Sequence, residues 1–192
     1  MASTSRIFLK DIPSEYEKDV VRALKKLGHE AVLQAYAEKS FTNRSHNLHD
    51  SYGSAVYFRG TIVGSSVQYL ENPISRKKDK KTGKTGRQTV RDYLYSHNFG
   101  ASNQEIVLVV VAAMYYAGIL EAGGMKRVKT GSEGGPKTKK VATSRGPGDK
   151  FKVISPARAY ISKRIGGIIA EINAKYGMKE VPKTRVIKGE RL

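Results

Sequence analysis

Two short segments of the chain carry residue types that could perform chemistry, and neither completes a site. Residues 81–87 read KTGKTGR and contain the Gly83-Lys84-Thr85 triplet found in phosphate-binding loops. Such a loop needs another glycine five residues before Gly83, where Lys78 stands, and it must lie between a strand and a helix. The sequence therefore argues against a nucleotide-binding loop.

The second segment is a pair of histidines followed by an acid. His46 and His49 are three residues apart and Asp50 comes next, a combination that could bind a metal ion. No third ligand with supporting spacing is visible, so we interpret both histidines as exposed or capping residues. The chain has no cysteine, no Gly-x-Ser-x-Gly sequence and no repeated acidic pair on one helical face. We expect a protein that is not an enzyme, with no catalytic residue, metal or cofactor.

Basic side chains are the more informative residues. The 192 residues include 35 Lys and Arg against 17 Asp and Glu, a formal charge of +18. Residues 76–91 hold eight cations and one acid, and residues 126–152 hold nine cations and two acids. Such runs are either solvated loops or contacts for a polyanion, because neutralising phosphates releases their counterions. The candidates for contact with DNA or a partner are Arg76, Lys77, Lys78, Lys80, Lys81, Lys84, Arg87, Lys126, Arg127, Lys129, Lys137, Lys139, Lys140 and Arg145.

Two long helices are the clearest elements that could hold these segments in place. Ser14 and Glu17 form a capping-box pattern, and the apolar spacing that follows predicts a helix over 14–38, with a possible kink at Gly28 and His29. A second helix is predicted to begin with Ser155 as N-cap and Pro156 next, and to end before Gly177.

The strands and loops follow from composition. Residues 53–58 and 61–69 predict a β-hairpin, and the unalternating apolar run 106–113 predicts a strand that is covered on both faces at the centre of the sheet. Residues 76–88 predict a mobile loop. A short helix over 88–97 is predicted to follow it and to lead the chain back to the folded domain. Residues 123–150, rich in Gly, Pro and Lys, predict a second loop.

Together these elements predict a single α+β domain over 1–177. An antiparallel sheet would carry the two long helices, with basic loops at about 71–104 and 123–150. Residues 178–192 lack periodicity and predict an extended arm that orders only against a neighbour. The longest apolar run, 106–120, is fifteen residues, whereas a membrane span takes about 20. The first residues lack the apolar stretch of a signal peptide, so we expect synthesis in the cytoplasm and no membrane contact.

Three motifs, in order along the chain, carry a resemblance to known proteins. They are 44–53 (RSHNLHDSYG) before the predicted hairpin, 116–123 (YAGILEAG) after the predicted central strand, and 151–157 (FKVISPA) before the last helix. In this order they resemble the minor tail and tail-completion family of tailed bacteriophages, which is related to head-to-tail neck proteins. The sequence departs from the family pattern at His46, where glycine is usual, at His49, where arginine is usual, and in the longer insert 71–104.

The resemblance implies a virion structural protein at the head-to-tail junction, made in the host cytoplasm and assembled with copies of itself into a ring around the DNA channel. Its other partners would be neighbouring portal, connector or tail proteins, and DNA phosphates without sequence specificity. Such a ring needs two different complementary patches on each subunit. We expect Glu121, Lys183, Arg185 and Arg191 at subunit interfaces. The basic loops would face either the channel or adjacent rings.

Two of the motifs also have ordinary local interpretations. Asn47 and Asp50 are typical of a turn whose side chains bond nearby backbone, with Leu48 as the one side chain in the core. Glu121 and Gly123 fit either the end of a helical turn or an intersubunit contact by Glu121.

Two other functions stay open on the sequence alone. The two basic segments fit a nucleic-acid-binding module, and it would be indifferent to base sequence, because no aromatic residues alternate with the cations beyond Tyr93 and Tyr95. A small nuclease ranks below it, since paired acidic metal ligands are not evident.

Overall fold

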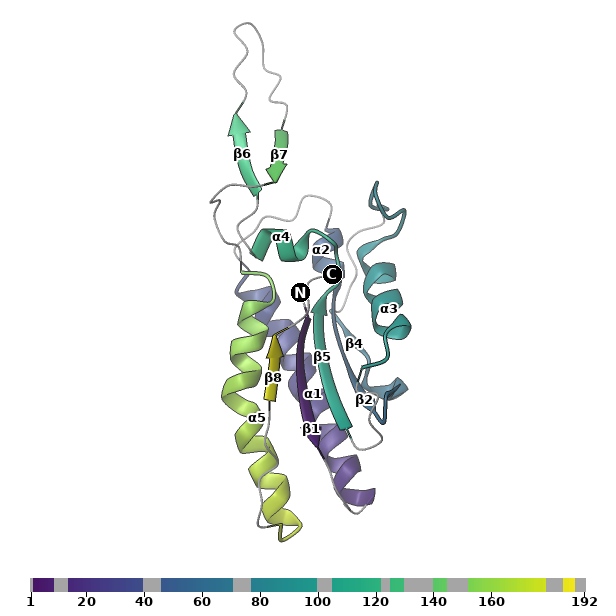
Figure 1. The fold of residues 1–192 in the computed structure, drawn as a ribbon, viewed down its shortest axis with the longest axis vertical. Helices are drawn as coiled ribbons and strands as arrows, with labels where there is room; N and C mark the ends of the chain where they lie inside the picture. The colour runs from purple at the N-terminus through teal and green to yellow at the C-terminus, as the bar shows by residue number, and fades with distance from the viewer. Residues whose placement is uncertain are drawn as a thin grey trace, which may run out of the picture.

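The computed structural model describes residues 2–8, 14–39, 46–70, 77–99, 105–121, 125–129, 140–144, 152–178 and 185–188. Two long helices lie on one face of an antiparallel sheet, and a shorter helix covers part of the other face (Figure 1). This arrangement confirms the α+β class, with a long N-terminal helix and a C-terminal helix packed on the sheet. None of the described helices is long and apolar enough to span a membrane.

The main sheet has the strand order β3-β2-β5-β1-β8, and every neighbouring pair in it is antiparallel. Its strands are β1 (Ala2–Phe8), β2 (Tyr52–Phe58), β3 (Thr61–Ile62), β5 (Glu105–Ala112) and β8 (Arg185–Lys188), with β4 (Gln68–Tyr69) also paired to β2. As predicted, β5 is central and buried on both faces: Ile106, Leu108 and Val110 meet the long helices, and Val107 and Val109 face the other way.

The predicted hairpin forms, but its second strand is interrupted. A 3-10 turn at Gly64–Ser66 separates β3 from β4, and the Ser66 hydroxyl fills the gap in the ladder. Its Oγ accepts a hydrogen bond from Val56 N (2.8 Å) and lies 3.0 Å from Val56 O. The hydroxyl thus provides the acceptor for buried Val56 N in the gap between β3 and β4, whereas Val56 O also accepts a hydrogen bond from Val63 N at 2.9 Å.

Two strands of the sheet were not predicted. β1 has the sequence ASTSRIF, which is too polar to suggest a strand, yet it pairs along its whole length with β5. β8 pairs with β1 of the same chain, from Ser3 opposite Lys188 to Arg6 opposite Arg185. The prediction that this part of 178–192 orders only against a neighbour is therefore wrong for β8, because the edge of β1 supplies a partner within the chain.

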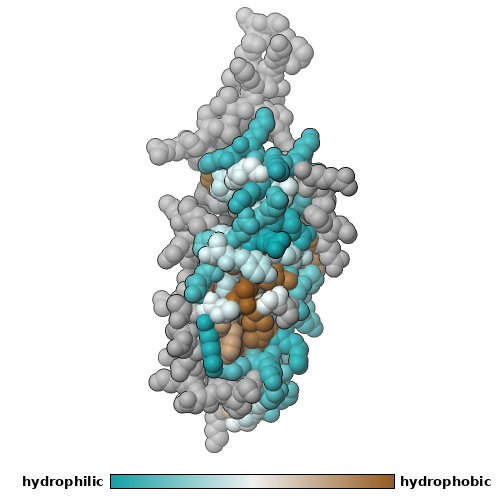
Figure 2. All heavy atoms as spheres, turned by 90° about the vertical axis from the view of Figure 1, so that its right-hand side faces the viewer, coloured by the Kyte–Doolittle hydropathy of each residue, from teal (hydrophilic) through white to brown (hydrophobic). Residues whose placement is uncertain are grey.

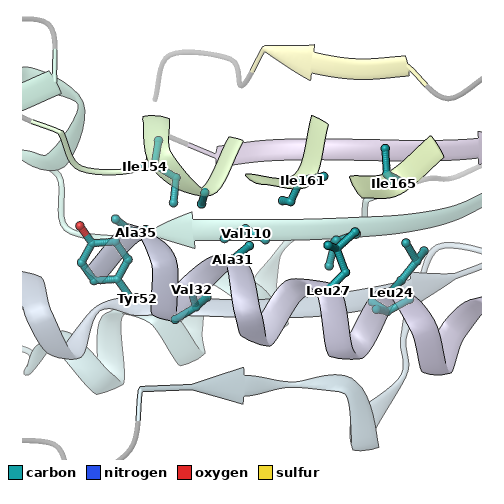
Figure 3. Close-up of a cluster of buried hydrophobic side chains, with 14 of the residues drawn as sticks. Leu24, Leu27, Ala31, Val32, Ala35, Tyr52, Val110, Ile154, Ile161 and Ile165 are labelled. Atoms are coloured by element: carbon teal, nitrogen blue, oxygen red, sulfur yellow. The ribbon is translucent and has the colours of Figure 1, made fainter. Parts of the chain in front are cut away.

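The two long helices, α1 (Ser14–Ala37) and α5 (Ser155–Lys175), run antiparallel to each other, since the start of α1 meets the end of α5. Tyr16 at that end donates a 2.6 Å hydrogen bond to buried Asn173, and Tyr160 donates one of 2.9 Å to Glu30 farther along. Figure 3 shows Leu24, Leu27, Ala31, Val32 and Ala35 of α1 and Ile154, Ile161 and Ile165 beside α1 and β5 in one buried cluster.

Gly28 allows α1 to approach the sheet closely. A Cβ atom at this position would lie 2.8 Å from Leu108 Cδ1 and 2.9 Å from Ser54 Oγ. The helix continues through Gly28 from Ser14 to Ala37. The glycine that lowered the helix propensity of the sequence is therefore explained by packing against β2 and β5.

Helix α3 (Gly86–Ser96) covers the opposite face of the sheet and confirms the short helix predicted near 88–97. Its Val90 and Leu94 pack on Ala55, Tyr57 and Val109. Figure 2, which views this side, shows an apolar area surrounded by hydrophilic residues. Two further short helices, α2 (Asn47–Asp50) and α4 (Ala117–Glu121), lie near one end of the sheet (Figure 1).

Candidate polyanion-binding surface

The first basic segment contains a closed turn where the sequence predicted a mobile loop. Asp79 Oδ1 accepts hydrogen bonds from Lys81 N (2.9 Å) and Thr82 N (3.0 Å). The backbone closes through Asp79 N to Lys84 O at 2.9 Å and Gly83 N to Asp79 O at 2.8 Å, with Gly83 at φ +67°. Asp79, the one acid of residues 76–91, is therefore bonded within the turn. Backbone and side-chain hydrogen bonds hold the turn without a buried apolar side chain.

The turn presents its cations to solvent. Lys77, Lys78, Lys80, Lys81 and Lys84 are all exposed. Lys81 Nζ lies 4.3 Å from the centre of the Tyr115 ring, just before α4, and Lys84 Nζ pairs with Asp92 at 2.5 Å. Exposed ion pairs of this kind contribute at most about 1 kcal/mol, so the cations keep most of their capacity to bind an external anion.

Arg87 differs from the other candidates because it is partly buried. Its guanidinium lies 4.6 Å from the centre of the Tyr69 ring and donates a hydrogen bond to Leu70 O. These contacts tie α3 to β4. We therefore assign Arg87 a structural role, and its contact with DNA or a partner stays a prediction.

The turn is joined to the body through the first turn of α3. Thr85 is the N-cap, with a complete capping box to Gln88. The N–H of Gly86 donates to Asn47 Oδ1 at 3.2 Å, and a Cβ on Gly86 would lie 1.9 Å from Asn47 O. Only glycine fits here without a shift of α2 or α3, so this contact fixes where the basic turn begins.

The histidine segment is more buried than predicted. His46 is half-buried in a left-handed conformation at φ 58°, whereas Asn47, Leu48, His49 and Asp50 are all buried. His49 Nδ1 lies 2.5 Å from Asp50 Oδ1, and its ring packs edge-on against Tyr36 at 4.6 Å. The interpretation of His49 as exposed or capping is wrong, as is that of Leu48 as the one core side chain of the segment. Among the described residues, no group of three or more His, Asp or Glu could hold a metal ion.

The second basic segment contains a β-ladder where the sequence predicted a loop. β6 (Met125–Lys129) pairs antiparallel with β7 (Lys140–Ser144), with Val128 opposite Val141 and Lys129 opposite Lys140. The two strands form a sheet of their own, and Figure 1 shows it beyond the end of the main sheet, past α4. The alternation of Val128 and Val141 with cations is too short to stand out from the Lys, Gly and Pro around it.

Glu121, the last residue of α4, caps α5. Its Oε1 accepts hydrogen bonds from Ile154 N (3.2 Å) and Ser155 N (2.5 Å). The helix has Ile154 as its N-cap and no side-chain cap of its own, so the carboxylate takes the place of the usual Ser or Asp. The prediction of Ser155 as N-cap is wrong, because a cap from 34 residues away leaves no local sequence signal. The contact of Glu121 with a neighbouring subunit stays a prediction.

A second contact holds the same junction. Tyr52 donates a 3.0 Å hydrogen bond to Val153 O, and Val153 and Ile154 are fully buried. Burial, and to a lesser degree the nearby Glu121 carboxylate, raises the pKa of Tyr52 well above its usual range. The hydroxyl therefore keeps its proton and remains a donor at any physiological pH.

The structure brings the two basic segments to the same end of the molecule. Figure 1 shows the turn before α3, the start of α4 and the β6–β7 ladder at one end of the sheet, and the Lys81–Tyr115 contact links the first of these to the second. Lys126, Arg127 and Lys129 lie on β6, Lys140 on β7 and Arg185 on β8. The other candidates, Arg76, Lys137, Lys139, Arg145, Lys183 and Arg191, lie outside the described residues.

No family model, curated protein or solved structure matches this chain.

Proposed function

We propose that this chain is a virion structural protein of a tailed bacteriophage, a subunit of the head-to-tail neck or tail-completion apparatus that assembles as a ring around the DNA channel. The observation that supports it best is the separation of the chain into a compact sheet-and-helix body and a strongly basic end. A subunit of such a ring has to pack against its copies while tolerating or guiding the phosphates that pass through the centre.

The two sides of the body differ, as a closed ring requires. The sheet ends with β3 and β4 on one side, where Ser66 bonds the backbone of β2, and with β8 on the other. Side-by-side packing of copies would join the β8 side of one subunit to the β3–β4 side of the next, which is a heterologous contact. The apolar area of Figure 2 lies on the α3 side of the molecule and offers such a contact a hydrophobic centre.

Light scattering after gel filtration and negative-stain electron microscopy test this proposal on the purified full chain. We expect a mass of several subunits and annular particles. A matched variant that ends at residue 178 removes β8, so it should stay folded and run as a smaller species. A full chain that is monomeric at all concentrations, and that stays so when mixed with the other particle proteins, would refute the ring.

A sequence-independent nucleic-acid-binding module is the second candidate, and the shared location of the two basic segments favours it. The two candidate functions predict different behaviour of the purified chain in the absence of other particle proteins. A monomer that binds DNA tightly at physiological salt supports the module, whereas ring assembly with weak, salt-sensitive binding supports the virion role.

A further inference from the structure

The outer face of α3 differs in composition from the basic turn that precedes it. Residues 77–84 hold five lysines, whereas no lysine occurs between residues 85 and 125. The cations of α3 are Arg87 and Arg91, and with Tyr95 they follow one another at intervals of four residues. Residues four apart lie on one face of a helix, so these three side chains form a stripe along α3. Figure 1 shows α3 on the outside of the sheet, with no other described element beyond it.

Tyr69 of β4 lies beside this stripe. The Arg87 guanidinium is 4.6 Å from the centre of the Tyr69 ring. Burial, and to a lesser degree Tyr95, raises the pKa of Tyr69, whereas the nearby charges of Arg87 and Arg91 act in the opposite direction. Arg91 and Tyr95 are exposed, Tyr95 to 55%. Two cations and two phenols therefore lie close together, and one of each is open to solvent.

The two arginines have no carboxylate partner among the side chains that the structure describes. The acid of α3, Asp92, pairs with Lys84 instead. A guanidinium presents forked donors that match the two oxygens of a carboxylate, which the point charge of lysine does not. Arg and Tyr are also enriched in protein–protein interfaces, where Lys is depleted. The composition of this face therefore favours a protein partner with acidic side chains over nucleic acid.

A second copy of the chain has few carboxylates to offer. The acids that already bond to other groups of their own chain are Glu15, Glu17, Asp19, Glu30, Glu38, Asp50, Asp79, Asp92 and Glu121. Glu171 is the one other acid whose side chain the structure describes. Two copies, each with a formal charge of +18, also repel one another. The partner that fits is therefore a different, acidic protein.

We propose that the outer face of α3, through exposed Arg91 and Tyr95 beside Arg87 and Tyr69, binds the carboxylates of an acidic segment on a different protein. The arginine pairs with the carboxylate, and Tyr95 contributes apolar area and a hydroxyl donor. This binding does not depend on the formation of a ring.

Fluorescence anisotropy of a labelled oligoglutamate peptide, titrated with the purified full chain, tests this proposal. The variant carries Arg91→Gln and Tyr95→Ala. The matched control carries Lys80→Gln and Tyr115→Ala, which also removes one exposed cation and one exposed tyrosine, but at the basic turn and α4. We expect the variant to bind about tenfold more weakly and the control about twofold or less, because interface Arg and Tyr residues contribute more than screened surface charges. Equal losses in the two proteins, or full binding by the variant, would overturn the proposal.

Arg91→Lys separates carboxylate recognition from net charge. This variant keeps the charge and removes the fork, so its affinity for the peptide should fall toward that of the double variant. Binding equal to that of the wild type would show that only charge matters and would overturn the proposal. Arg91 is exposed, so the thermal unfolding midpoint should not change, and Arg91→Lys decides the question even where the double variant fails to fold.

Two further measurements identify the occupant of this face. The double variant should bind duplex DNA as the wild type does, and a larger loss for DNA than for the peptide would assign the face to DNA. It should also assemble as the wild type does in gel filtration with light scattering, and lost assembly would show that a second copy occupies the face; either result overturns the proposal. A full chain that binds the peptide through Arg91 and Tyr95 but never assembles refutes only the proposed function.

Discussion

Single side chains connect distant parts of this chain, and Glu121 is the clearest case. It ends α4, yet its carboxylate accepts the N–H groups of Ile154 and Ser155 at the start of α5. Asn47 does the same for Gly86 at the start of α3. Both residues belong to or adjoin segments that the sequence marked as motifs, and in both cases the side chain positions a helix next to a basic segment.

Replacing Glu121 by alanine should lower the free energy of unfolding by about 1 to 2 kcal/mol, because α5 then loses its only side-chain cap among the described residues. Glu121→Gln keeps an oxygen acceptor and should retain most of the stability. Urea unfolding measures both, with Glu171→Ala on the exposed surface of α5 as the control that should change stability by less than about 0.5 kcal/mol. An alanine variant as stable as the wild type would contradict the capping role.

Among the elements, the two long helices, the short helix α3, the first strand of the hairpin and the central strand could be predicted from the sequence. Their apolar spacing is strong, and β5 is an uninterrupted β-branched and aliphatic run. β1 and β8 could not be predicted, since they are formed by pairing rather than by hydrophobic pattern. The β6–β7 ladder could not be predicted either, because its apolar residues are few and lie within a lysine-rich segment.

The same substitution in the two long helices should have opposite effects. Gly28→Ala would bring a Cβ to 2.8 Å from Leu108 and should destabilise the protein by about 1 to 3 kcal/mol. Gly167→Ala in α5 meets no atom within 4 Å and should stabilise it by about 0.5 to 1 kcal/mol through helix propensity. Thermal and urea unfolding of both variants would show this, and a Gly28→Ala variant as stable as the wild type would contradict the close approach of α1 to the sheet.

The pairing of α1 with α5 should depend on pH through Asp19. Hydrogen bonds from Lys175 (2.5 Å) and Tyr176 (3.0 Å) hold the pKa of Asp19 below its usual value of 3.8. Because the pKa is lower in the folded state, the contribution of Asp19 to stability is present above pH 3.8 and is lost as the pH falls through the folded pKa. Asp19→Asn should therefore be less stable than the wild type at pH 7, and the difference should shrink as the pH falls below 3.8 and through the folded pKa. A constant difference from pH 7 to pH 2 would exclude this origin.

At the scale of the whole molecule, the structure separates a body of modest charge from a strongly basic end. The sequence predicted two basic segments of similar charge, but not that they would lie at the same end of the molecule. Their positions depend on α2, α3 and α4, whose contacts are made by side chains such as Asn47 and Tyr115. A run of charged residues has no periodicity that specifies where it lies in the fold. The sequence therefore predicted which residues form the candidate surface, but not where that surface lies on the molecule. Arg87 and Glu121, both predicted to contact partners, also make hydrogen bonds inside the fold that the sequence did not indicate.

The central claim is that this chain forms a ring in a phage particle, and cryo-electron microscopy of the particles made by the genome that encodes it tests this most directly. A tagged copy of the chain should localise to a ring between head and tail, with the end that carries the turn before α3 and the β6–β7 ladder turned toward the central channel. Particles that lack the chain, or that carry it away from the head-to-tail junction, would contradict the proposed function.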